Sequence, residues 1–456
     1  MGSGVLAAAA AGKTGSASAA IPNDLMAFLR EVIGVFFFQL TKFTPNFSLP
    51  MLNTDQIRQQ FPALQRTHQS KHLTFLDGPA GTQVPQRVID AISHYYQTSN
   101  ANTHGEFLTT NETDQVVEGM RMRVAALLNA EGPATISIGQ NMTTLNFALA
   151  RAIARSLQPG DEVLITQLDH EGNRGPWLML REWGITVREV RLLPTGRLDY
   201  EDMAQKMNER TRLVAMGLAS NAIGTVNNVK IARELSHKVG AWLLLDAVHY
   251  APHFSLDVQQ MGCDFLLCSA YKFYGPHIGL LYSRPGLLDR LNTDRLRTAG
   301  QIAPDKIETG TLNHAAIHGV SAAIDFIASL GKGAALRAQL EDAYQQIGAH
   351  EFALAKTLYE GLSAIREVQV VGTDFADRHR APTVSFTMEG KTATEVCRHL
   401  AAENIFAWDG HFYAIRAIET LGLLERGGVT RIGMAVYNTD EEVQRTLASL
   451  RALAER

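Results

Sequence analysis

Short, continuously apolar runs alternate with amphipathic stretches through the middle of the chain. Runs such as "ATISIG" (134–139) and "AWLLLDA" (241–247) contrast with "QNMTTLNFALARAIARSL" (140–157) and "VKIARELSHKVG" (229–240), which are typical of helices. Continuous apolar runs are typical of strands that are covered on both faces. Strands that alternate with helices predict an α/β fold with a large, doubly wound, mostly parallel sheet.

The pattern changes after about residue 315. Long Ala/Leu-rich stretches there precede short strand-like runs such as "PTVSFTM" (382–388) and "VTRIGMAVYN" (429–438). This order predicts a smaller α+β domain packed against the first one. We therefore expect four parts: an N-terminal extension, a helical segment that joins the small domain, the large domain and the small domain, over residues 1–50, 51–70, 71–315 and 316–456.

The N-terminal extension is unlike the rest of the chain. It contains the low-complexity run "VLAAAAAGKTGSASAA" (5–20), which is typical of a flexible leader. An apolar stretch follows, but its basic flank is weak and no clean cleavage site comes after it. We expect an upstream extension rather than a working targeting signal.

Composition narrows the class of protein. A chain of 456 residues is long enough for a large and a smaller domain. The net charge of -4 gives no electrostatic reason to expect nucleic acid or an anionic membrane as a partner. The three cysteines, Cys263, Cys268 and Cys397, have no metal-type spacing and cannot form a disulfide framework. We expect no metal site, and a reducing, cytoplasmic location.

Polar residues gather where the predicted strands end. Parallel sheets bind ligands outside the carboxyl ends of their strands, so this edge is the expected position of a site. The residues that fall there are Asn141, His170, Asn221, Asp246, His249, Ser269 and Lys272.

Lys272 and Asp246 together indicate a cofactor. A lysine at a strand end is partly desolvated, and a neutral amine can form a Schiff base with an aldehyde. An acid from a neighbouring strand can hold the proton of a pyridine nitrogen, which pyridoxal 5'-phosphate (PLP) needs as an electron sink. Taken singly, the two residues would be a surface lysine and a helix-capping aspartate.

The same segment resembles the PLP site of class V aminotransferases, and specifically of the cysteine desulfurase and selenocysteine lyase group. In that group an acid leads a D-x-x-[QH] motif, and the lysine follows a serine and a histidine before "GP". The similarity runs from "FLDGPAGTQVP" (75–85) to "RIGMAVYNTDEEV" (431–443) and implies the PLP-dependent fold type I. The corresponding residues here are Asp246, His249, Ser269, Tyr271 and Lys272.

The resemblance implies roles for the residues around the cofactor. Backbone amides of Asn141 and Met142 would bind the phosphate at a helix N-terminus, and Ser269 would add a hydroxyl. His170, in "LDHEGN", would stack on the pyridine ring and act in catalysis with Lys272 and Asp246. Asn221 and His249 would lie beside the phenolic oxygen, and Tyr271 replaces the usual histidine.

Other residues carry implications for the partner and the substrate. Thr311, in "ETGTLNH", corresponds to a threonine that reaches the phosphate of the other subunit, so a homodimer with shared active sites is implied. Arg431 corresponds to the arginine that binds the substrate carboxylate, which suits its two-pronged donor geometry. His104 corresponds to an active-site histidine, although a structural histidine is nearly as well supported.

One loop departs from the family pattern. Where desulfurases have R-x-G-H-x-C-A, this chain has "IFAWDGHFYAI" (405–415), and Tyr413 replaces the cysteine nucleophile. A phenol cannot form an enzyme persulfide as a thiolate does. Trp408, His411, Phe412 and Tyr413 would make an aromatic pocket for a larger or less polar substrate side chain, in which His411 or Tyr413 protonates a leaving group. Alternatively, these aromatic residues simply close the small domain over the cofactor.

The sequence thus predicts a PLP-dependent lyase or transferase that acts on an amino acid through a Schiff base at Lys272. Side-chain cleavage such as C–S or β-lysis without a cysteine nucleophile is favoured. Transamination and a non-catalytic PLP-fold binding protein are the alternatives. A nicotinamide-dependent dehydrogenase is set aside, because the G-x-G-x-x-G turn is missing.

Overall fold

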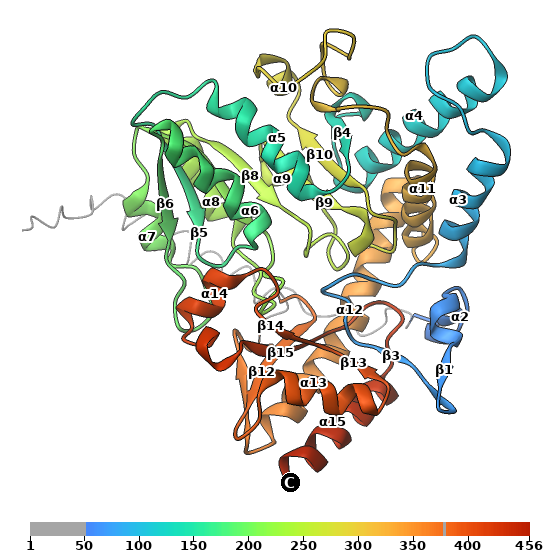
Figure 1. Ribbon diagram of the computed structural model, residues 1–456, viewed down its shortest axis with the longest axis vertical. Helices are drawn as coiled ribbons and strands as arrows, with labels where there is room; N and C mark the ends of the chain where they lie inside the picture. Colours follow the sequence, from blue (N-terminus) through green and yellow to red (C-terminus); the bar gives the residue numbers. More distant parts are fainter. Residues whose placement is uncertain (1–51, 377–379) are drawn as a thin grey trace, which may run out of the picture. The chain divides into compact units, whose positions relative to one another are not determined.

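The computed structural model describes residues 52–376 and 380–456, which belong to one compact unit. The predicted extension over residues 1–50 lies outside the described residues. A seven-stranded sheet is the larger of the sheets in Figure 1. Its strands, in spatial order, are β4 (Ile136–Gly139), β10 (Gly279–Ser283), β9 (Phe265–Ser269), β8 (Trp242–Asp246), β7 (Thr211–Gly217), β5 (Glu162–Thr166) and β6 (Thr186–Val190).

The large sheet is mostly parallel, as the sequence predicts. The five strands from β9 to β6 pair in parallel, whereas β10 is antiparallel to both of its neighbours, β9 and β4. Every residue of β5, β9 and β10 is buried, which explains why these runs are continuously apolar rather than alternating. The α/β fold class is therefore confirmed.

Helices cover the large sheet. One core joins α5 (Met142–Ala154) and α6 (Glu171–Leu178) to the strands, with Trp177 and Ile153 packed around Leu244 of β8 and Leu267 of β9. α8 (Val229–Val239) contacts β7 and β8. A separate group of helices packs together beside them: α3 (Gln86–Thr98), α4 (Leu108–Leu128) and α11 (His314–Ala328).

A four-stranded antiparallel sheet forms near the C-terminus. Its order is β11 (Val368–Val371), β12 (Thr383–Met388), β15 (Val429–Gly433) and β14 (Trp408–Gly410). It packs with the helices α12 (Leu336–Ser363), α13 (Ala393–Ala402) and α15 (Asp440–Ala454), and α12 also reaches α11 and α4 (Figure 1). Short strands among helices agree with the α+β character predicted after residue 315.

The first described residues pair with this C-terminal part. β3 (Thr74–Phe75) lies parallel to β13 (Ile405–Phe406), and the carbonyl of Leu76 accepts a hydrogen bond from Gly433 N at 2.9 Å. α2 (Thr54–Gln59) is held there by Arg58, whose guanidinium is 2.9 Å from Glu442. The exact domain boundaries stay a prediction.

None of the helices in the described part of the chain is long and apolar enough to cross a membrane.

The remaining elements are short. The short elements are β1 (Thr67–His68), β2 (Lys71–His72), α7 (Tyr200–Lys206), α9 (Val258–Met261), α10 (Leu287–Arg290) and α14 (Ile415–Thr420), with 3₁₀ turns at Pro62–Gln65, Pro133–Thr135, Met179–Trp183, Ala270–Lys272, Asp305–Ile307 and Leu424–Arg426.

Candidate active site

Lys272 is a buried amine at the end of a central strand. β9 ends at Ser269, and a single 3₁₀ turn, Ala270–Lys272, places the side chain beside the segment that follows β3. Its Nζ donates to the carbonyls of Pro79 and Ala80, the latter at 3.0 Å. Burial, with a further contribution from the positive charge of Arg431, lowers the pKa of Lys272 to about 7. A large fraction of this amine is therefore neutral near neutral pH.

Asp246 is the last residue of β8, the strand next to β9. It is 8% exposed, and its carboxylate accepts a hydrogen bond from Val248 N at 2.9 Å. Burial raises the pKa of Asp246 to about 6, while the charge of Lys272 opposes that shift. Burial also raises the pKa of a second acid, Asp169, to about 7, and the charge of Asp246 adds to that shift. A cationic ring nitrogen beside Asp246 would favour the ionised carboxylate that this pocket otherwise disfavours.

His170 begins α6 and faces the same cluster. Its Nδ1 accepts a hydrogen bond from Gly172 N at 2.8 Å, which makes it the N-cap of that helix. Burial, and then the charges of Lys272 and Arg431, lower the pKa of His170 to about 4. The ring is therefore neutral near pH 7, as suits a residue that stacks on another aromatic ring.

The turn between β4 and α5 leads into the helix whose first amides are expected to bind the phosphate. Asn141 caps α5 through its side chain, which accepts from Thr144 N, and the Met142 amide donates to Ser269 Oγ at 3.0 Å. A Cβ atom at Gly279 would lie 2.3 Å from the carbonyl carbon of Asn141, so only glycine lets β10 approach this turn. The first amides of a helix lack helical partners and attract an anion.

His249 is buried with one nitrogen unpaired. Its Nε2 lies 2.9 Å from Thr383 Oγ1, whereas Nδ1 has no hydrogen-bond partner among the described residues. Burial lowers the pKa of His249 well below its ordinary value, so the ring is neutral. If the Thr383 hydroxyl donates to Nε2, then Nδ1 carries the proton and needs an acceptor. A cofactor oxygen beside Nδ1 would satisfy this buried group.

Arg431 comes from β15 of the small sheet and meets Asn221 in the turn that follows β7 of the large one. Nη1 of Arg431 donates to the backbone carbonyl of Asn221 at 2.8 Å, and Nε is buried without a partner in the described structure. The residue is 3% exposed, and burial lowers the pKa of Arg431 to about 9 in spite of the negative charge of Asp77. An acceptor with negative charge would stabilise this guanidinium.

The loop after β14 reaches the same cluster through its backbone. Asn221 Nδ2 donates to the carbonyl of Phe412 at 2.8 Å, and Glu171 N donates to the carbonyl of Tyr413 at 2.6 Å. The Tyr413 ring centroid is 5.7 Å from that of His170. His411 Nδ1 accepts from Tyr413 N at 3.2 Å.

Three of the predicted site residues do not make the contacts expected of them around Lys272. Tyr271 stacks on His277, with the ring centroids 4.7 Å apart. Thr311 is exposed and lines a separate pocket of about 430 Å³ together with Tyr96. The side chain of His104 is 87% exposed and lies 3.4 Å from Asp114. Neither Thr311 nor His104 is brought to Lys272 within this one chain.

The structure adds residues that the sequence analysis did not single out. Asp77 follows β3 and forms an isolated parallel β-bridge with Gly433. Burial raises the pKa of Asp77 to about 6, although the charge of Arg431 and a hydrogen bond to Trp408 both act to lower it. Asp77 Oδ1 has no partner in the described residues. The quoted run "FLDGPAGT" contains Asp77, but only the pairing of β3 with the C-terminal part brings it to Arg431. Thr383 is the other addition.

None of the three cysteines is a residue of the loop. All three are buried, and burial raises the pKa of Cys268 and of Cys397 to about 12 and raises that of Cys263 further. Cys397 lies on α13, the helix that Thr430 contacts by donating to Ala393 O at 3.4 Å. Cys397 is nevertheless near Arg431, because each of these two groups shifts the pKa of the other.

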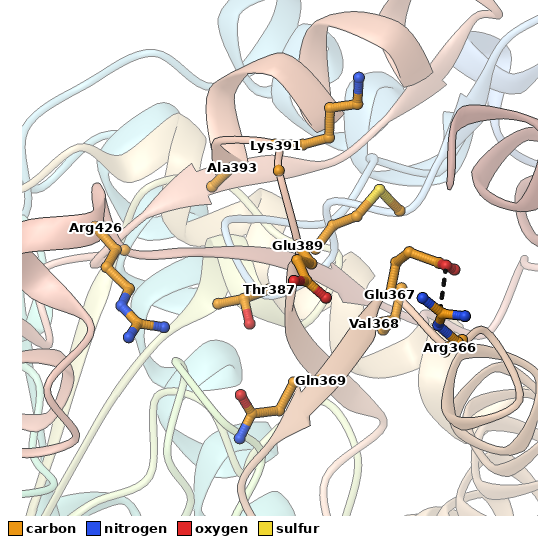
Figure 2. A pocket seen from close by; sticks show the side chains of 12 residues that line it. Arg366, Glu367, Val368, Gln369, Thr387, Glu389, Lys391, Ala393 and Arg426 are labelled. Atoms are coloured by element: carbon orange, nitrogen blue, oxygen red, sulfur yellow. Dashed lines mark ion pairs between the residues drawn. The ribbon is translucent and has the colours of Figure 1, made fainter. Parts of the chain in front are cut away.

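Another hollow lies on the small sheet. A pocket of about 480 Å³ lies between β11, β12 and the turn at Gly390. Figure 2 shows that charged side chains of both signs line it. Arg366 and Glu367 form a loose ion pair of 3.7 Å there. None of the predicted site residues lines this pocket, so it is distinct from the cluster around Lys272.

Comparison with known proteins identifies the family. The sequence model of the family described as "Aminotransferase class-V" matches residues 74–446. A probable cysteine desulfurase of Vibrio cholerae is 32% identical over 417 residues, covering 88% of this chain and 98% of its own. The aminotransferase-like protein FGM3 of Gibberella zeae is 33% identical over 409 residues, covering 87% and 97%.

Solved structures show the same architecture. The cysteine desulfurase CsdA of Escherichia coli, crystallised as its S-sulfonic acid, superposes with a TM-score of 0.77 at 27% identity, covering 89% of this chain and 99% of its own. The apo cysteine desulfurase of Thermococcus onnurineus NA1 has a TM-score of 0.79 at 24% identity, covering 90% and 100%. The second likeness concerns the fold alone.

Proposed function

The chain belongs to the class V aminotransferase family, whose members use pyridoxal phosphate, and we propose that it cleaves the side chain of an amino-acid substrate without a cysteine nucleophile. The observation that carries this proposal is the buried amine of Lys272, which shares one cluster with Asp246, His170 and Arg431. The enzyme is desulfurase-like and has fold type I.

The residues present fit the cofactor. When bound, pyridoxal phosphate supplies an aldehyde and an electron-withdrawing ring. Lys272 provides a neutral amine for the aldehyde, and Asp246 provides the acid for the ring nitrogen. The unpaired Nδ1 of His249 fits an oxygen acceptor, and the start of α5 fits a phosphate.

Lys272 and Arg431 have different tasks with the substrate. Arg431 binds the α-carboxylate through its planar donors and so orients the substrate. Lys272, whose pKa is lowered to about 7, would take a proton from the α-carbon and return it at neutral pH. Both side chains are buried, so water is largely excluded from the atoms that react.

The leaving group needs an acid rather than a thiol. All three cysteines are buried with raised pKa values, so no thiolate is available at the loop. The ring centroid of Tyr413 is 5.7 Å from that of His170, and the Tyr413 hydroxyl or His411 would donate the proton to a departing side-chain atom. β-Elimination requires such a proton but no nucleophile on the enzyme.

We also propose a homodimer with shared active sites. Thr311 lies apart from Lys272 in this chain, at an exposed pocket, which supports a role at the phosphate of a second subunit. The cytoplasmic location stays a prediction, supported only by the three unpaired cysteines.

The test is product analysis with purified, PLP-loaded protein. L-Cysteine, cysteine sulfinate and a panel of L-amino acids are supplied, and we expect pyruvate and ammonia from a substrate with a β-leaving group. Pyridoxamine phosphate with a keto acid would assign transamination instead. Sulfide or sulfite with alanine would show desulfuration without the loop cysteine. Products from Lys272→Ala at the wild-type rate would contradict the mechanism, and no product from any of them would favour a binding protein.

A further inference from the structure

Phe412 covers one face of Arg431. The guanidinium carbon of Arg431 lies 3.9 Å from the centroid of the Phe412 ring, at the short end of cation–π contacts. Because the guanidinium is buried and its pKa is lowered, its charge is poorly solvated, and the electron-rich face of the ring offsets part of that loss.

The register of the small sheet brings the ring to this position. Trp408 at the start of β14 pairs with Arg431 of β15, and Gly410 at its end pairs with Val429, so the loop that follows β14 starts two residues from the arginine along β15. Gly410 has a φ of 107°, and Phe412 and Tyr413 have φ values of 53° and 56°. These left-handed residues turn the chain back over the strand that it has just left.

Asn221 joins the two partners in a closed arrangement. Its carbonyl accepts from Arg431 Nη1, and its side-chain amide donates to the Phe412 carbonyl, both at 2.8 Å. The arginine is therefore fixed at one nitrogen by a hydrogen bond and at one face by a ring. Nε, on the edge of the guanidinium plane, is buried without a partner among the described residues.

We propose that Phe412 is a positioning residue for Arg431 and makes the site selective for ligands that carry an α-carboxylate. A carboxylate binds guanidinium in the plane, along its edge, so a ring that holds that plane prepares the arginine for this one geometry. Without the ring, the side chain must be ordered when the ligand binds, which costs affinity. This inference rests on the proposed function, because it concerns the same substrate site.

The test compares two ligands that differ only in the carboxylate. L-Phenylalanine and 2-phenylethylamine are titrated into PLP-loaded protein, and dissociation constants are read from the absorbance of the bound cofactor, without turnover. We expect wild type to prefer the amino acid clearly. Phe412→Leu, which keeps apolar bulk but no ring, should lower that preference about tenfold, mainly through weaker binding of L-phenylalanine. Phe412→Tyr should retain the wild-type preference.

The outcomes separate this inference from the proposed function. A wild-type preference that is unchanged in Phe412→Leu overturns the role of Phe412 alone, as does an equal loss of affinity for both ligands. A wild-type protein without any preference, or without any response, overturns the amino-acid function and this inference together. Unchanged thermal unfolding of both variants shows that the loop substitutions have not disturbed the fold.

Discussion

At the scale of single residues, Lys272 is controlled by where it is buried. Its amine rests on the carbonyls of Pro79 and Ala80, near the charges of Arg431 and Asp246. Burial disfavours the ammonium form, and Arg431 adds to this by repulsion. The reactivity of the lysine therefore depends on keeping this pocket dry.

The pH dependence of cofactor capture tests this state of Lys272. Only the neutral amine attacks an aldehyde, so the capture rate of PLP by cofactor-free protein should rise with pH and level off above about 7, where the lowered pKa of Lys272 lies. The measurement is the absorbance of bound PLP after rapid mixing at a series of pH values. A rate that keeps climbing through pH 9 would show an ordinary, solvated lysine, and Lys272→Ala should show no such phase.

At the scale of elements, α12 is held to the segment after β8 by a buried contact between a histidine and a glutamate. His253 Nδ1 and Glu351 Oε2 are 2.7 Å apart, and their side chains are 4% and 1% exposed. His253 in turn packs edge-on against His249, with ring centroids 5.3 Å apart. The long helix of the C-terminal part therefore contacts a neighbour of the candidate site.

Glu351→Ala should be destabilising. Removing the carboxylate leaves a buried ring nitrogen of His253 without its hydrogen-bond partner, at a cost of roughly 1 to 3 kcal/mol in the free energy of unfolding. Glu360 is the matched control on the same helix, because it is 64% exposed and lies 3.7 Å from Lys356. Glu360→Ala should cost less than about 1 kcal/mol. Denaturant unfolding measures the free energy of unfolding of both variants. Equal losses of this free energy in the two variants would contradict the prediction.

The contact between β10 and the start of α5 gives a second prediction. Gly279→Ala places a Cβ atom 2.3 Å from the Asn141 carbonyl carbon, so the turn must move away from the strand. We expect PLP affinity to fall about tenfold or more, since the amides at the turn lose their positions.

Gly119→Ala is its control. Gly119 lies within α4, where the nearest atom to a new Cβ is Arg123 Nη1 at 3.5 Å, an ordinary contact. Alanine there should stabilise the helix by about 0.5 to 1 kcal/mol and leave PLP affinity unchanged. Equilibrium dialysis with PLP and thermal unfolding give both quantities; equal PLP affinity in the two variants would mean that the turn tolerates the shift.

At the scale of the whole molecule, exposed apolar side chains favour a second copy of the chain. Phe107 and Leu108 at the start of α4 are 60% and 72% exposed, and Tyr96, which lines the pocket of Thr311, is 60% exposed. Apolar side chains in such number beside a predicted shared site are typical of an interface.

Light scattering should give a native mass of twice 50.0 kDa. Leu108→Asp should shift the protein toward the monomer and reduce retained PLP, because the shared phosphate contact is lost. Trp183 is exposed by 43% on the turn Met179–Trp183, and Trp183→Asp is the control that should leave the mass unchanged. A monomeric wild type with full PLP content would contradict the shared site.

The sequence predicts what lies at the ends of its own strands. Asp246 and Lys272 each close an apolar run, so their meeting follows from parallel pairing of β8 and β9. Contacts between the two sheets could not be found in this way. Thr383 meets His249 across 134 residues of chain, and Asp77 reaches Arg431 only because residues 74–77 pair with C-terminal strands. Such contacts depend on how the two complete sheets pack against each other, and a local sequence pattern does not predict that packing.

The loop after β14 is anchored by carbonyl oxygens rather than by side chains. Asn221 holds the Phe412 carbonyl, and the Glu171 amide holds that of Tyr413, so the path of the chain does not depend on which side chains stand there. The side chains at these two positions can therefore be replaced while the backbone of the loop keeps its path. β-Branched residues are the exception, because the left-handed backbone at both positions disfavours them. Divergence of reaction type among relatives would then require single codon changes instead of remodelled loops.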